Sequence, residues 1–316
     1  MKDKKKLYIL CTISIVLIGL FLFIGLNENN FHYNLSRRIP RVIAIVLTGG
    51  SIAFSSIIFQ TVTNNRIITP GVLGLDSLYS LLQTVVVFIF GSSSIFMIDS
   101  RVNFIASTVF MLIGTFILYK LLLSNGKTNI YVLLLVGTIF GTFFRSLSTF
   151  MQVLIDPNDY DTLQNKLFAS FTNVNVEILF IAIVCIGLIF AWVYDDIKKL
   201  DVMLLGRENA ISLGIDYDGL TKKMFIIIAI LIAVSTALVG SITFLGVLVV
   251  NLSYQFMNSF RHKYLIPCSI FISIIALIGG QFIVERLLNY NSKVSIIINF
   301  IGGLYFIYLL LKENKK

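Results

Sequence analysis

The apolar run from Leu7 to Leu26, LYILCTISIVLIGLFLFIGL, contains no charged residue. A transmembrane helix needs about 20 mainly apolar residues, whereas the apolar core of a secretory signal spans about 7 to 15. This run follows four lysines and ends at Asn27-Glu28-Asn29-Asn30, with no small-residue cleavage site. We therefore expect a retained membrane helix whose N-terminus lies in the cytoplasm.

The composition of the rest of the chain agrees with this reading. Of the 316 residues, 57% are hydrophobic and only 13% are charged, and the mean hydropathy is +0.91. Soluble proteins carry about 25% charged residues. Nine further apolar segments follow: 42–60, 71–91, 102–123, 131–153, 176–194, 224–241, 242–257, 264–284 and 294–311. The sequence predicts an all-α polytopic membrane protein with about ten transmembrane helices in a single domain, 1–316. The segment 242–257 is short, which leaves open that it extends the helix before it.

The distribution of basic residues gives the orientation. Ten spans put both termini on one side, and cytoplasmic loops are enriched in lysine and arginine. With both termini inside, seventeen basic residues lie in inner segments and seven in outer ones. The net charge of +9 is therefore explained by membrane orientation, and we expect no nucleic-acid partner.

The sequence lacks the residues for common catalytic sites. Gly126-Lys127-Thr128 is the only fragment like a Walker A loop, but the motif needs a glycine where Leu121 stands. The two histidines, His32 and His262, lie far apart, so neither a zinc site nor a histidine-based triad is expected. We expect no catalytic residue, no metal site and no cofactor.

Charged residues in two places do not follow the general pattern. Arg37, Arg38 and Arg41 crowd one short external loop, where they either reach lipid headgroups or dock an acidic external partner, and we favour docking. Arg145 is the one clear charge within a span, and Asp76 lies a turn inside another. Proton-coupled transporters usually keep acidic groups in mid-membrane, so the shortage of such groups favours a transporter driven from outside the bilayer.

The longest cytoplasmic segment, 195–223, contains a predicted short helix. Ala210, Ile211 and Leu213 form an apolar side, Glu208 suits the first turn, and Gly214 suits a left-handed cap. A two-turn helix is unstable alone in water, so we expect it to pack against its own membrane domain or a cytoplasmic subunit.

Several motifs occur in the order typical of one family. They are Arg38-Ile39-Pro40-Arg41; Gln60, followed by Asn65-Arg66-Ile67-Ile68-Thr69-Pro70-Gly71-Val72-Leu73-Gly74; the stretch from Leu205 to Gly214; Gly240-Ser241-Ile242-Thr243-Phe244-Leu245-Gly246-Val247; and Gly302-Gly303-Leu304 in the last span. This order resembles the permeases of ATP-binding-cassette importers for ferric siderophores, haem and cobalamin. The chain departs from the family at Arg66, where a proline is usual, and at Val250 to Tyr254, where Pro-His-x-x-Arg is usual. It also departs at Lys293 to Ile297, before the last span.

The resemblance implies a type II importer half-pore with ten helices. Its implied partners are a second permease, identical or related, two ATPase subunits, and an external substrate-binding protein that is lipid-anchored or periplasmic. The resemblance also implies three sets of residues. The binding protein would dock on Arg38, Arg41 and Arg286. The ATPase would couple through Leu205, Gly206, Arg207, Glu208, Ala210, Leu213 and Gly214, and the pore or gate would contain Gln60, Asn65, Thr69, Pro70 and Arg145.

The expected function is import of an iron(III)-siderophore complex across a bacterial cytoplasmic membrane. ATP would be hydrolysed by a partner, so this chain is not expected to be an enzyme. A cobalamin or haem importer is the near alternative, and an ion-coupled secondary transporter is the alternative from a different class.

Overall fold

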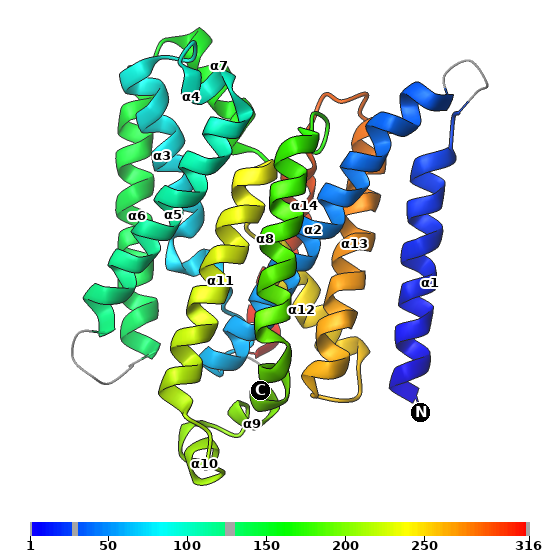
Figure 1. Cartoon of the computed structure of the whole chain (residues 1–316), viewed down its shortest axis with the longest axis vertical. Coiled ribbons are helices and arrows are strands. Elements are labelled where there is room, and N and C mark those ends of the chain that lie inside the picture. Colours follow the sequence, from blue (N-terminus) through cyan, green and yellow to red (C-terminus); the bar gives the residue numbers. More distant parts are fainter. Residues whose placement is uncertain (1, 27–30, 124–129, 314–316) are drawn as a thin grey trace.

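The computed structural model describes residues 2–26, 31–123 and 130–313, and its regular elements are helices (Figure 1). Ten apolar helices correspond to the ten predicted spans: α1 (Lys2–Phe23), α2 (Phe31–Thr63), α3 (Leu75–Phe90), α5 (Ser100–Leu123), α6 (Ile130–Leu154), α8 (Val176–Val193), α11 (Tyr217–Val239), α12 (Leu245–Phe256), α13 (His262–Arg286) and α14 (Val294–Glu313). Eight of these helices provide segments long and apolar enough to cross a membrane, and α3 and α12 are shorter apolar helices. The predicted all-α polytopic fold is confirmed.

Short elements connect the spans at the two ends of the bundle. At one end lie α4 (Ile95–Ile98) and α7 (Pro157–Leu167), and at the other lie η3 (Tyr194–Asp196), α9 (Ile197–Met203) and α10 (Arg207–Ser212) (Figure 1). The beginning of α1 lies at the same end as α9 and α10 (Figure 1). Following the charge asymmetry of the sequence, we call this the inner end and the opposite one the outer end. The fragment Gly126-Lys127-Thr128 lies outside the described residues.

Helix α2 lies at the centre of the bundle because small residues let its neighbours approach. It packs against α11 and α13. A Cβ atom added to Gly49 would lie 2.6 Å from Ser273 Oγ of α13. Between α3 and α6, a Cβ on Gly141 would lie 3.0 Å from the Gly74 Cα. Larger side chains at these positions would separate the helices.

Helix α2 also begins earlier than its apolar pattern indicates. The predicted span starts at residue 42, but the helix starts at Phe31 and continues through Pro40. The expectation that Arg37, Arg38 and Arg41 lie in a loop is therefore wrong. Apolar runs report only the part of a helix that is buried or in lipid, so a polar extension at a helix end is missed.

The uncertain segment after residue 241 forms a separate helix. Gly240 ends α11 with φ of +104°, a backbone conformation that favours glycine. The next residue, Ser241, forms a parallel β-bridge with Phe168, and its N–H donates to the Leu167 carbonyl. This break turns the chain back into α12 and gives an even number of spans.

Candidate functional site

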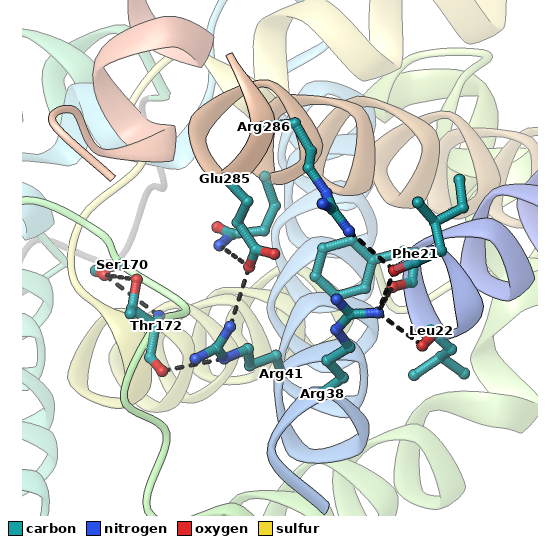
Figure 2. Close-up of polar contacts among 10 residues, drawn as sticks. Phe21, Leu22, Arg38, Arg41, Ser170, Thr172, Glu285 and Arg286 are labelled. Carbon is teal, nitrogen blue, oxygen red and sulfur yellow. Dashed lines mark hydrogen bonds and ion pairs between the residues drawn. The ribbon is translucent and has the colours of Figure 1, made fainter. Parts of the chain in front are cut away.

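Three arginines predicted from distant parts of the sequence come together at the outer end. We call Arg38, Arg41 and Arg286 the outer arginine cluster, and they lie where α1, α2 and α13 meet (Figure 2). Each guanidinium donates hydrogen bonds to neighbouring groups of the chain. Because of these bonds, the cluster contributes to the structure of the outer end.

Two members of the cluster hold the end of α1. Arg38 Nη1 donates to the carbonyls of Phe21, Leu22 and Ile24 at 3.1, 2.8 and 2.8 Å. Arg286 Nη2 donates to the Ile24 carbonyl at 2.9 Å. The last carbonyls of a helix lack intrahelical donors and carry partial negative charge. The two arginines therefore cap α1, while the Arg286 side chain stays exposed.

The third member, Arg41, is buried in an ion pair. Its Nη1 lies 3.1 Å from the Glu285 carboxylate, with only 10% and 8% of the two side chains exposed. Arg41 Nε donates to the Thr172 carbonyl at 3.0 Å, and Gln281 donates to Glu285 at 2.8 Å. Breaking a buried pair by removing one partner costs about 3–5 kcal/mol. Glu285 was missed in the sequence, although an acid next to Arg286 at the end of a span was a usable signal.

The predicted coupling segment forms a short helix at the inner end. Helix α10 covers Arg207–Ser212, between Gly206 and Gly214, which have φ of +89° and +84°. The predicted left-handed conformation of Gly214 is thus confirmed. Arg207 pairs with Asp218 at 2.9 Å, and Glu208 lies in the first turn.

The apolar side of α10 is only partly covered by the chain itself. Ala210 is fully buried, whereas Leu205, Ile211 and Leu213 have 55%, 47% and 63% of their surface exposed. Apolar side chains that gather at an exposed surface are typical of an interaction site. The sequence left open what this side packs against, and in this chain most of it faces outward.

A buried histidine connects the coupling segment to α2. The His262 backbone N–H and Nδ1 lie 2.7 and 2.6 Å from Asp201 Oδ1 in α9. Its Nε2 lies 2.7 Å from Thr61 Oγ1, near the inner end of α2. The imidazole is completely buried. From the sequence, His262 was considered only as a possible zinc ligand, and no pattern indicated this link.

Of the predicted gate residues, Asn65, Thr69 and Pro70 follow the inner end of α2, Gln60 lies in its last turn, and Arg145 lies in α6. Asn65 Oδ1 accepts a hydrogen bond from the Ile67 N–H at 2.9 Å, and the buried residues Thr69 and Pro70 lead into η2 (Pro70–Leu73). Gln60 is 2% exposed, and neither of its amide atoms has a hydrogen-bond partner among the described residues. Gln60 also lines the inner cavity described below.

Two departures from the family motifs lie in contact. The Arg66 guanidinium lies 5.1 Å from the ring centroids of Tyr254 and Phe260, and the Arg66 carbonyl accepts from Asn251 at 3.1 Å. In this chain the contact is a cation–π interaction between the Arg66 guanidinium and the two rings. The contact borders an inner cavity of about 650 Å³ that Gln60 also lines.

Arg145 lies on the exposed side of α6 and lines an open cavity of about 330 Å³, together with Thr142, Thr243 and Phe306. The Asp76 carboxylate lies near Thr243, Ser241 and Arg145. Charged groups within a membrane nearly always face a polar partner or water. Arg145 therefore places a charged side chain at a cavity between η2, α6 and α14 whose lining surface is mainly apolar.

Among the described residues, no group of three or more histidine, cysteine or acidic side chains is placed to hold a metal ion.

Comparison with known proteins finds matches over almost the whole chain. Residues 7–312 match the FecCD transport family. The chain is 53% identical over 315 residues to the petrobactin import system permease protein YclO of Bacillus subtilis, covering 100% of this chain and 99% of that protein. It is 33% identical over 322 residues to the petrobactin import system permease protein FatC of Bacillus anthracis, covering 99% and 91%.

A solved structure shares the fold. It is described as an inward-facing conformation of a metal-chelate type ABC transporter, and it superposes with a TM-score of 0.84 at 21% identity. The match covers 98% of this chain and 99% of that chain.

Proposed function

The chain belongs to the FecCD transport family, and on this basis we propose that it is the permease subunit of an ATP-binding-cassette importer for an iron(III)-siderophore complex. The observation that carries the proposal is the 53% identity to a petrobactin import permease over 315 residues, which cover 100% of this chain. The ten-helix fold agrees with it. A ferric chelate of the petrobactin class is the proposed cargo, and cobalamin and haem become the alternatives.

ATP hydrolysis is assigned to a partner at the inner end, so this chain acts as a transporter and not as an ATPase. The exposed apolar residues Leu205, Ile211 and Leu213 offer the contact surface. From there, a displacement of α9 would reach α2 through Asp201, His262 and Thr61. Gln60 directly precedes Thr61, and Asn65, Thr69 and Pro70 follow within ten residues, which is how motion at the ATPase would open or close the inner cavity.

A second permease would complete the translocation path. The cavity with Arg145 opens on a surface of α6 and α14, and an exposed arginine on a membrane helix does not face lipid alone. A second copy or a related chain across this surface would enclose Arg145 in the pore.

The proposed localisation follows from the same scheme. The chain would be a multi-pass protein of the bacterial cytoplasmic membrane with both termini inside.

The outer arginine cluster is the proposed docking site of the substrate-binding protein. Arg286 is exposed and Arg38 is partly exposed, so acidic groups of a partner can reach them. Arg41 contributes by holding the outer end together, since its charge is already paired. Ion pairs at a rim mainly steer association and fix orientation.

We expect Arg38→Glu combined with Arg286→Glu to weaken binding of the loaded binding protein about tenfold or more. Exposed pairs contribute about 0–1 kcal/mol each, and reversal replaces attraction by repulsion at two positions. The measurement is the Kd for the purified complex at low and high salt. Arg101→Glu is the matched control, because Arg101 also lies at the outer end but pairs with Glu177. Equal Kd values for the double variant and wild type would exclude this docking site.

The proposed function is tested in cells lacking the gene. Uptake of radiolabelled ferric petrobactin should disappear and return with the wild-type gene. If ferric siderophore uptake stays at the parental level while cobalamin or haem uptake is lost, the cargo assignment is wrong.

A further inference from the structure

An outer cavity of about 590 Å³ shares none of its lining residues with the arginine cluster or the predicted gate. Its walls come from α7, the connection 168–175, the last turn of α11 and the connection before α14. Small-molecule sites occupy about 300–1,000 Å³. The cavity is therefore large enough to receive a substantial part of a chelate.

Hydrogen bonds between distant segments fix the walls of this cavity. Tyr79 donates its hydroxyl to the Lys166 carbonyl at 3.1 Å. Lys293 Nζ donates to the carbonyl and side-chain oxygens of Asn165 at 3.0 and 2.8 Å. Thr172, another lining residue, accepts from Arg41 at 3.0 Å. The cavity is thus a built feature of the fold, connected to the outer arginine cluster.

The charges that line the cavity have one sign. Lys166 and Lys293 both line it, and none of the lining residues carries a carboxylate. The nearby Glu177 pairs with Arg101 instead. Burial lowers the pKa of the Lys166 and Lys293 ammonium groups, so a bound anion would offset an existing desolvation cost. Tyr290, Ser292 and Asn173 add neutral polar groups.

We propose that this outer cavity binds the anionic oxygen groups, carboxylate or catecholate, of the ferric chelate, with Lys166 and Lys293 as its charged contacts. The proposal rests on the proposed function and adds a substrate site to it. Chelates that bind Fe³⁺ through several such oxygens carry net negative charge, which two ammonium groups without lining acids attract. The cavity would then receive the chelate at the outer end, before the cavity that Arg145 lines.

The test is equilibrium binding of ferric petrobactin to the purified permease–ATPase complex without the binding protein. Lys166→Gln combined with Lys293→Gln should raise the Kd about tenfold or more. Lys166→Arg with Lys293→Arg should stay within about twofold of wild type. Arg37→Gln, which removes an exposed outer cation that does not line the cavity, should leave the Kd unchanged.

Two results would overturn the site. One is an unchanged Kd for the double glutamine variant; the other is an equal loss in Arg37→Gln, which would indicate a general effect of surface charge. Uptake by the wild-type complex with its binding protein is measured in parallel. If wild type takes up the chelate but the Lys166→Gln, Lys293→Gln variant has an unchanged Kd, the cavity site is excluded and the proposed function stands. If wild type takes up no chelate, the proposed function itself is excluded.

Discussion

Replacing Arg41 with glutamate is expected to abolish uptake and to reduce the amount of folded protein in the membrane. The substitution places two carboxylates in a site where Glu285 is 8% exposed. Loss of one partner of a buried pair costs about 3–5 kcal/mol, which is a large part of the stability of an ordinary protein. The Thr172 carbonyl would also lose its donor. Uptake and membrane abundance, measured on the same cells, check the result.

The charge-exchanged variant, Arg41→Glu with Glu285→Arg, separates the ion pair from other roles of Arg41. It should recover much of the abundance lost in the single variant. Arg37→Glu is the control for charge on the same helix, because Arg37 is exposed and stacks on Tyr33. Wild-type abundance in the Arg41→Glu single variant would contradict a structural role for this pair.

This pair also marks where sequence reasoning stopped. The apolar runs, the charge asymmetry and the motif order predicted ten spans, because each membrane helix is a continuous apolar segment of the sequence. Arg41 and Glu285 are 244 positions apart, and no local pattern relates them. The sequence therefore singled out Arg41 near the end of a span but could not indicate that its charge is already paired.

The second large effect is expected at α10. Ile211→Asp combined with Leu213→Asp should reduce uptake more than tenfold while membrane abundance stays near wild type. Both side chains are largely exposed, so the folded chain loses little packing. An ATPase subunit that buries them would instead meet two unpaired carboxylates, whose desolvation is costly. Co-purification of the ATPase with tagged permease measures the contact directly.

The matched control is Ser212→Asp, which adds one carboxylate to the same helix at an exposed residue between the two. It should retain the ATPase and most of the uptake. Normal ATPase retention in the Ile211→Asp, Leu213→Asp variant would exclude this surface as the contact.

The inner half of the site was only partly predictable for a similar reason. Glycine positions and apolar periodicity predicted α10 and the conformation of Gly214. The contact of Arg66 with Tyr254 joins two motif departures that look unrelated in the sequence. The link from Asp201 through His262 to Thr61 joins three segments, and a lone histidine at a helix start carries no sign of it.

The most direct measurement of the central claim is transport by purified components. The permease, its second permease, the ATPase and the binding protein are reconstituted in vesicles and supplied with radiolabelled ferric petrobactin. We predict accumulation that requires ATP hydrolysis and the binding protein and that continues when ion gradients are dissipated. Accumulation that follows an ion gradient and proceeds without ATP would contradict the account and indicate an ion-coupled secondary transporter.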